Sequence, residues 1–307
     1  MGSAISADNN KVGRDDIAAS SSSSTGLGDL PESCISCVFM NLEPEDICKL
    51  ARVNKTFHRA SCADFVWESK FPPAFKFLLN QVLGGAGDDD QQKLQNSFTN
   101  KQIYATLCRP NRFHSGSKEV WLDRGSGQVC LLMSSKSMKI TGIDDRRYWN
   151  YIPTEESRFK SIAYLQQMWW VEVVGDVEFE FPQGRYSLYF RLQLGRASKR
   201  LGRRVCNVDQ VHGWNIKPVR FELSTSDGQN ALSECYLHGP GEWANYHVGD
   251  FVVGPSGGPI NIKFSLTQID CTHTKGGLSV DCAFICPTGL SKQNIMMKRE
   301  NIGKINN

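Results

Sequence analysis

Four cysteines near the N-terminus have types and spacing that could do chemistry. Cys34 and Cys37 form a C-x-x-C motif, followed by Cys48 and Cys62. Such a set could bind zinc or act as a redox pair. However, no histidine stands at ligand spacing, no βαβ pattern surrounds the pair, and Cys34 occupies an apolar position of a helical pattern. We therefore expect small buried or half-buried thiols here and no metal site.

Two motifs near the C-terminus match catalytic or metal-binding patterns by letter. Residues 254–258 read G-x-S-x-G, but a nucleophile elbow needs a strand-to-helix turn, and here proline and glycine separate two strand-like runs. Cys271, His273, Cys282 and Cys286 are spaced irregularly for zinc. We expect no catalytic residue, no metal and no cofactor.

Charged side chains form two dense groups. Glu172, Asp176, Glu178 and Glu180 alternate with apolar residues, which is typical of the solvated face of a strand rather than of an acid–base pair. Residues 196–204 hold five basic and no acidic side chains, which favours a solvated loop, with nuclear targeting as the alternative. Because the whole chain carries a net charge of only +3, we do not expect a nucleic-acid partner.

Composition sets the broad class. The 307 residues are 40% hydrophobic, enough for two modest domains or one large one. No apolar run approaches the ~20 residues of a membrane-spanning helix, and the N-terminus lacks a secretory pattern. The odd number of cysteines, 11, suits free thiols in a reducing compartment. We therefore expect a cytoplasmic or nuclear protein without a membrane span.

The chain divides into five segments. Residues 1–26 are polar, end in a serine run and predict a disordered tail; they open on a pattern that fits N-myristoylation, which the sequence leaves open. Residues 27–71 are helical, and residues 72–117 form a connector with helix candidates at 74–83 and 103–108 around a flexible stretch at 84–90. Residues 118–287 have strand periodicity, and residues 288–307 form a C-terminal tail.

The helical segment predicts a compact three-helix module. Cys34, Val38 and Leu42 recur at spacing four in the first helix, and Pro44 marks its end. A second helix extends to Phe57, and a third short one carries Trp67. A module of about 45 residues is too small to bury every apolar side chain, so we expect it to dock on a partner.

This segment, LGDLPESCISCVFMNLEPEDICKLARVNKTFHRASCADFVWESKF, resembles the F-box. Phe57 stands where that family often has tryptophan, and Asn54 where it often has cysteine. The resemblance implies binding to a Skp-type adaptor, which joins the chain to a cullin ubiquitin ligase. The alternative is a helical cap packed on the following domain. The residues implied to contact the adaptor are Leu30, Pro31, Val38, Leu42, Pro44, Ile47, Leu50 and Val53.

Residues 118–287 predict an antiparallel β-sandwich of jelly-roll type, with one face of each sheet turned inward. The fold class is therefore α+β by domain. Gly, Pro or Asn-Asp residues separate the strand-like runs, and no long amphipathic helix intervenes. The runs expected to face the core begin at Trp169, Tyr186, Val219 and Ile260.

The stretches KEVWLDRGSGQVCLLMSSKSMKITGIDDRRYW, WWVEVVGDVEFEF and EWANYHVGDF resemble the phloem lectin (phloem protein 2) family. That resemblance implies binding of N-acetylglucosamine oligomers or N-glycan cores, with Tyr148, Trp149, Asn261 and Gln268 as candidate sugar contacts. Gly142 stands where the lectins often carry a second tryptophan, which weakens stacking. The alternative for Trp149 is a packing role in the core.

Together these resemblances favour a non-catalytic substrate receptor of a Skp–cullin–F-box ubiquitin ligase, whose β-sandwich binds a target protein, glycosylated or not. One alternative is a free-standing lectin. The other is a protein-interaction module that no longer binds sugar.

Overall fold

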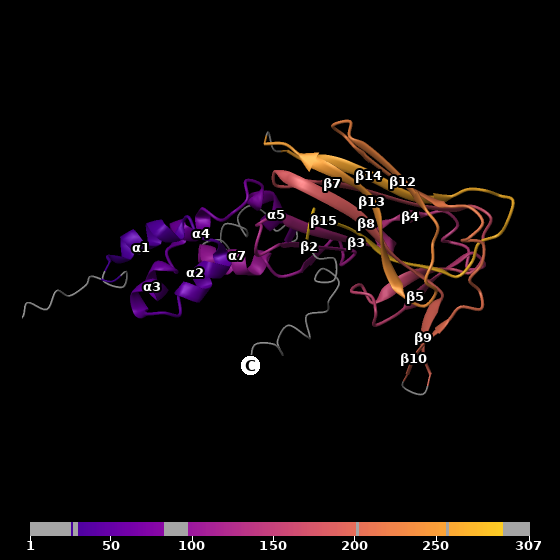
Figure 1. Ribbon diagram of the computed structural model, residues 1–307, viewed down its shortest axis with the longest axis horizontal. Helices are drawn as coiled ribbons and strands as arrows, with labels where there is room; N and C mark the ends of the chain where they lie inside the picture. The colour runs from indigo at the N-terminus through magenta and orange to yellow at the C-terminus, as the bar shows by residue number, and fades with distance from the viewer. Residues whose placement is uncertain (1–25, 27–29, 83–97, 201–202, 256–257, 291–307) are drawn as a thin grey trace, which may run out of the picture.

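The computed structural model describes residue 26 and residues 30–82, 98–200, 203–255 and 258–290. Short helices occupy the N-terminal part and β-strands the rest, so the chain is helical first and then antiparallel β (Figure 1). This arrangement confirms the expected fold class. In the part of the chain described, no helix is long and apolar enough to cross a membrane.

Four short helices, rather than three, form the N-terminal module. The difference arises at Asn54, whose side chain accepts a hydrogen bond of 2.8 Å from the backbone N–H of Phe57 and so caps a new helix. The expected second helix is therefore divided. The four helices are α1 (Glu32–Phe39), α2 (Pro44–Leu50), α3 (Lys55–Ala60) and α4 (Asp64–Glu68).

Helix α1 turns a different face inward from the one that its spacing suggested. Ile35 and Phe39 are buried, whereas Cys34 and Val38 are exposed. The two larger side chains sit four residues apart, so one turn of the helix buries both of them. Phe39 packs edge-on against Phe57 of α3, with ring centroids 5.8 Å apart.

Two further helices, α5 (Phe75–Val82) and α7 (Asn100–Leu107), lie in the expected connector and pack between the module and the sheets. The ring of Tyr104 lies 5.5 Å from that of Trp67 in α4. Phe77 of α5 meets Phe179 of the β-domain in a T-shaped contact at 5.0 Å. Both halves of the chain therefore share one continuous apolar core.

The strands form two main sheets and one hairpin. The eight-stranded sheet has β15 at its centre, paired with β3 and β6 on one side and with β8 on the other. The five-stranded sheet has the order β12-β11-β14-β7-β4. The strands are β1 (Asn111–Phe113), β2 (Lys118–Leu122), β3 (Val129–Ser134), β4 (Lys139–Ile140), β5 (Trp149–Pro153), β6 (Ser161–Leu165), β7 (Val171–Phe179), β8 (Gly184–Leu194), β9 (Arg196–Arg200), β10 (Arg203–Asn207), β11 (Val219–Thr225), β12 (Asn230–Cys235), β13 (Trp243–Val253), β14 (Ile260–Gln268) and β15 (Leu278–Pro287).

The five-stranded sheet follows the expected alternation. Its inward residues on β11 and β14 include Phe221 and Phe264, which are buried. The ring of Phe190, from β8 of the other sheet, lies 6.0 Å and 5.6 Å from these two rings. Aromatic contacts of this kind join the two sheets into a sandwich.

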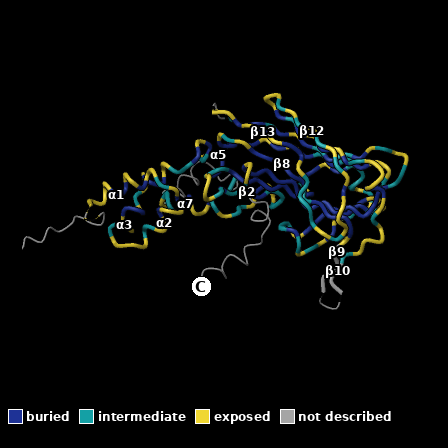
Figure 2. Tube along the Cα trace, viewed as in Figure 1, coloured by how far each residue is buried: buried dark blue, intermediate teal, exposed yellow. Residues whose placement is uncertain are grey.

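The eight-stranded sheet departs from the expectation that only one face is turned inward. Strands β3 and β15 are buried on both faces (Figure 2). On the outer face, Phe284 packs with half-buried Trp121 and Phe159. Two ion pairs, Arg158–Glu119 and Arg191–Asp281, are also covered there. Loop residues therefore close a second, smaller core over this sheet.

The basic stretch at 196–204 was expected to be a loop, but most of it lies in two paired strands, residues 196–200 in β9 and 203–204 in β10, which extend from the sandwich (Figure 1). The two strands pair in register from Arg196 with Asn207 to Arg200 with Arg203. Gly195, with φ of +99°, lies directly before β9. A backbone of this kind suits glycine and allows the chain to leave β8 and start the hairpin.

Candidate functional site

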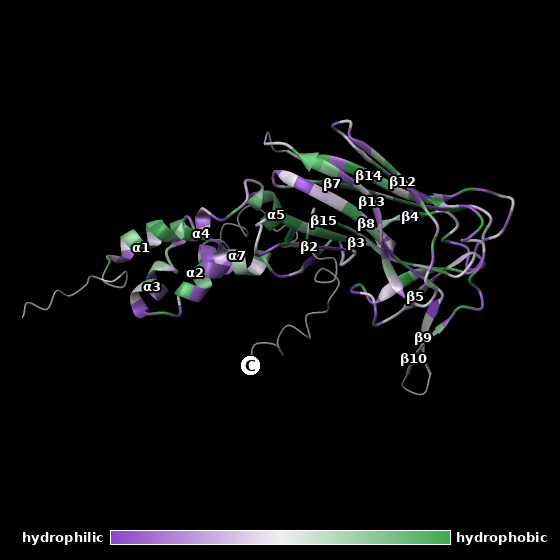
Figure 3. Ribbon diagram, viewed as in Figure 1, coloured by the Kyte–Doolittle hydropathy of each residue, from purple (hydrophilic) through white to green (hydrophobic). Residues whose placement is uncertain are grey.

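The helical module exposes several apolar side chains. Val53 is 66% exposed, Val38 49% and Leu30 39%. Met40 and Phe65 are also exposed. We call these five residues the exposed apolar set. Figure 3 shows apolar residues along α1, the helix farthest from the sheets. Exposed apolar side chains on a module that already has its own core are suited to a partner surface.

The eight predicted adaptor contacts fall into two groups. Leu30, Pro31, Val38 and Val53 are exposed, and Leu42 and Leu50 are half-buried. Pro44 and Ile47 are buried on the inner side of α2. The structure therefore gives the last two a packing role within the module, whereas the other six can reach a partner.

The cysteines of this module are exposed, contrary to the expectation of buried or half-buried thiols. Cys34, Cys37, Cys48 and Cys62 all lie at the surface. The reason is that the larger Ile35, Phe39 and Phe57 fill the small core. Among the residues described, no group of three or more His, Cys, Asp or Glu side chains could hold a metal ion.

In the sandwich, Tyr148 and Trp149 point to different environments. Trp149, the first residue of β5, is only 1% exposed, and its ring nitrogen has no hydrogen-bond partner among the described residues. A ring so deeply buried cannot offer a face to a sugar, which favours the packing alternative. Tyr148 is 37% exposed and its ring lies 5.6 Å from the guanidinium of Arg147.

Two tryptophans that were not singled out as binding residues are exposed near Tyr148. Trp169 is 53% and Trp170 44% exposed, although the alternation predicted an inward Trp169. The two residues precede β7, and consecutive side chains of an extended chain point to opposite faces. This alternation could have shown from the sequence that at least one of the two is exposed, because two adjacent tryptophans of a strand cannot both enter one core.

The backbone that carries these tryptophans is held by a buried lysine. The ammonium of Lys275 donates a hydrogen bond of 2.7 Å to the carbonyl of Trp169 and another to the carbonyl of Asp270. Backbone hydrogen bonds of 2.8 Å in both directions join Lys275 to Met168. Burial lowers the pKa of Lys275. This lysine therefore ties two loops together at one end of the sandwich.

Gly142 connects Tyr148 to the same end. A Cβ atom at Gly142 would lie 2.9 Å from Met168 Cε and 3.5 Å from Tyr148 Cδ2. Gly142 also has φ of +82°, a backbone angle that residues with a side chain rarely adopt. Gly142 therefore permits the close approach of Tyr148 and Met168. We call the exposed residues Tyr148, Trp169 and Trp170 the aromatic end.

Comparison with known proteins gives two family matches and several relatives. Residues 27–72 match the F-box-like family and residues 128–287 match phloem protein 2. The chain is 54% identical over 270 residues to F-box protein PP2-A13 of Arabidopsis thaliana, covering 88% of this chain and 91% of that protein. F-box protein PP2-A11 of the same plant is 53% identical over 264 residues, with coverage of 86% and 89%.

This chain belongs to the F-box proteins that carry a phloem protein 2 domain. Both resemblances inferred from the sequence are thereby confirmed. F-box proteins of this family are typically non-catalytic adaptors. The part of the 254–258 motif that would hold a serine nucleophile lies outside the described residues.

The phloem protein 2 domain does not gather all four of its predicted sugar contacts. Asn261 and Gln268 lie seven residues apart on β14, a separation of about 23 Å. Gln268 is 3% exposed, and its side-chain oxygen accepts a hydrogen bond of 3.2 Å from the backbone N–H of Asp270. Gln268 therefore supports the loop next to the aromatic end, and Asn261 lies at the other end of its strand.

Proposed function

We propose that this protein is the substrate receptor of a Skp–cullin–F-box ubiquitin ligase, working in the cytoplasm or nucleus. The observation that carries the proposal is the exposed apolar set on a module whose F-box family is established. A Skp-type adaptor would bury this set and join the chain to the cullin. The phloem protein 2 domain would hold the target protein.

Its mechanism is proximity and needs no reacting group on this chain. A bound target is held near a ubiquitin-charged enzyme, so that transfer becomes effectively intramolecular. The contact between Phe77 and Phe179 supports this role, because it joins the helical region to the sandwich. A stable junction restricts the positions that a bound target can take.

Co-purification with a Skp-type adaptor tests the proposal. Replacing Val38 with Glu puts a charge into the expected interface and should weaken adaptor binding by about 2 kcal/mol or more, roughly 30-fold. The double variant Leu30→Ala, Pro31→Ala should also lose binding. Val252→Glu is the matched control, since Val252 is 47% exposed on β13 of the sandwich. Absence of adaptor binding by the wild-type chain would refute the proposal.

A second candidate function, carbohydrate binding, is favoured by the aromatic end. Exposed aromatic rings offer apolar faces to a ligand, and Lys275 fixes the backbone of Trp169 beside them. We expect Trp169→Ala with Trp170→Ala to abolish any signal that the wild type gives on a glycan array. Tyr236→Ala, at another exposed aromatic residue, should leave that signal unchanged. If the wild-type chain binds no glycan, the sandwich acts as a protein-interaction module.

A further inference from the structure

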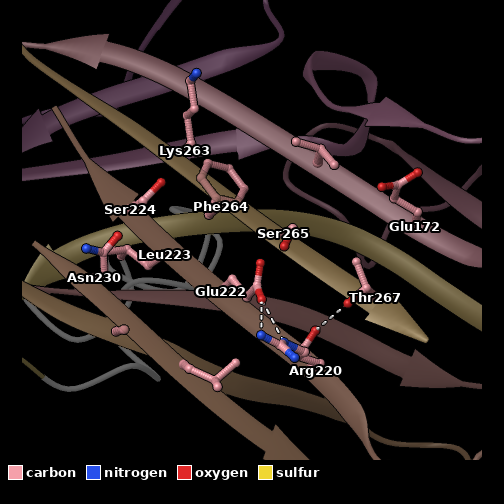
Figure 4. A pocket seen from close by; sticks show the side chains of 13 residues that line it. Glu172, Arg220, Glu222, Leu223, Ser224, Asn230, Lys263, Phe264, Ser265 and Thr267 are labelled. Carbon is pink, nitrogen blue, oxygen red and sulfur yellow. Dashed lines mark hydrogen bonds and ion pairs between the residues drawn. The ribbon is translucent and has the colours of Figure 1, made fainter. Parts of the chain in front are cut away.

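The outer face of the five-stranded sheet holds an open groove with a volume of about 620 Å³ (Figure 4). Strands β7, β11, β12 and β14 supply its walls. The groove is lined by Glu172, Val174, Arg220, Glu222, Leu223, Ser224, Asn230, Ala231, Leu232, Lys263, Phe264, Ser265 and Thr267.

Strand register arranges the lining in rows across the sheet. Neighbouring strands lie about 4.8 Å apart, so residues in register form a continuous band of side chains on one face. The bands run, from β11 through β14 to β7, as Arg220–Thr267–Glu172, Glu222–Ser265–Val174 and Ser224–Lys263–Asp176. The middle row carries the small side chains Ser265 and Val174 beside Glu222, and each outer row carries two charged groups.

Two of the four charged groups that line the groove are available to a ligand. Arg220 Nε lies 2.6 Å from Glu222 Oε1, so these two groups satisfy each other. Thr141 donates a hydrogen bond of 2.9 Å to one oxygen of Glu172, which leaves the second oxygen to accept another. Lys263 is exposed, and no described carboxylate, Asp176 included, lies within ion-pair distance of its ammonium.

The chemistry of the lining selects the class of ligand. Its two acids and two bases sum to no net charge, which gives no attraction for a polyanion such as nucleic acid. The only aromatic side chain in the lining, Phe264, is 2% exposed, so no ring is offered for a sugar to stack on. Leu232 is 57% exposed and adds an aliphatic surface. Hydroxyls, aliphatic groups and charges of both signs together complement another polypeptide.

We propose that this groove binds an extended segment of another polypeptide, with an acidic side chain opposite Lys263 and a basic one opposite Glu172. The register sets their spacing. Glu172 pairs with Thr267, which is four residues from Lys263 on β14, about 13 Å along the strand. An extended segment along the strands covers that distance in about four residues. This inference rests on the sheet alone and does not depend on adaptor binding.

Fluorescence anisotropy with labelled nine-residue peptides tests the inference. The peptides alternate serine and valine and carry one glutamate and one lysine, placed one to six residues apart in both orders. We expect the full-length protein to bind best at a spacing of about four, in one order, and more weakly at high salt. Affinity that does not depend on spacing, or equal binding of a peptide without charges, would overturn the proposal.

Charge reversal locates the bound peptide. Lys263→Glu should weaken binding of the best peptide about tenfold, and a peptide with lysine in place of its glutamate should regain most of that loss. Lys263→Gln should weaken peptide binding less, and the lysine-substituted peptide should not restore its affinity. Lys55→Glu makes the same change of charge at an exposed residue of α3 and should have no effect. If a neutral oligosaccharide instead displaced the peptide, with an affinity that changes in Glu172→Gln, the groove would be identified as a glycan site. That result would refute the proposal that it binds a polypeptide.

Discussion

The helical module and the sandwich solve the problem of apolar burial in different ways. The sandwich covers both faces of its central strands, so that all ten residues of β15 are buried. The module buries Ile35, Phe39 and Ile47 but leaves Val38 and Val53 exposed. A segment of about 45 residues has too much surface for its volume. The larger domain therefore covers its own central strands, and the smaller one leaves apolar surface that a partner can cover.

Electrostatics separates the same two regions. In the sandwich, the side chain of Asp281 is 1% exposed and pairs with Arg191, whose guanidinium lies 4.3 Å from the ring centroid of Trp243. Removing one partner of a buried pair usually costs about 3–5 kcal/mol, because the other charge stays buried. In the module, the pair between Lys49 and Glu45 is open to solvent. Breaking a charge pair should therefore be costly inside the sandwich and nearly neutral on the surface of the module.

The largest expected effect on stability comes from Trp149, because its ring is fully buried. The same substitution tests whether Trp149 belongs to the core of the sandwich or to a binding surface. Trp149→Ala should lower the free energy of unfolding by about 3–5 kcal/mol, the usual cost of removing a fully buried large ring. Urea unfolding followed by tyrosine and tryptophan fluorescence measures this loss.

Tyr148→Ala is the control for Trp149, since the neighbouring ring is 37% exposed. We expect it to change stability by less than about 1 kcal/mol. If Trp149→Ala instead kept its stability and lost a ligand, the assignment of Trp149 to the core would be wrong, and the contrast between a closed sandwich and an open module would weaken.

An intermediate effect is expected at the junction of the two regions. Phe77 is half-buried, and its contact with Phe179 joins α5 to β7. Phe77→Ala should cost about 1–3 kcal/mol through lost burial and lost aromatic contact. Calorimetry should show that the helical region of this variant unfolds at a lower temperature than the sandwich.

Phe98→Ala provides the comparison for the junction, because Phe98 is 48% exposed and precedes α7. We expect its thermal unfolding to match that of the wild type. Unchanged unfolding of Phe77→Ala would mean that the two regions are stabilised independently, and that the shared core does not couple them.

The sequence predicted the sandwich well because period-two alternation directly reports burial. Val171, Phe221 and Ile262, each expected to face inward, are buried. The same rule was wrong for Trp169, which lies just before β7 and outside its pairing with β14. Alternation therefore reports burial in the five-stranded sheet and fails at strand ends and in β3 and β15, which are covered on both faces.

Helix α1 was harder to predict because nearly every residue from Cys34 to Phe39 is apolar. Spacing alone then supports either of two faces, and the choice depends on neighbours that spacing does not show. Phe57, supplied by another helix, packs against Phe39 and fixes the buried face. The sandwich site met the same limit, since Gly142 brings Tyr148 close to Met168, the residue before Trp169, through a tertiary contact.

The smallest expected effect tests the surface charges of the module. Lys49 Nζ lies 3.2 Å from Glu45 Oε1 and 3.1 Å from Asp46 Oδ1, and hydrogen bonds to both carboxylates raise the pKa of Lys49. A raised pKa means that any stabilisation is complete at neutral pH and is lost as pH rises through the pKa of the folded state. Solvent and salt screen exposed pairs strongly, so Lys49→Ala should leave the urea midpoint at pH 7 unchanged within error. If Lys49→Ala lowered the urea midpoint clearly at low salt but not in 1 M salt, surface charge would stabilise the module. The module and the sandwich would then differ less in their use of charge than their burial suggests.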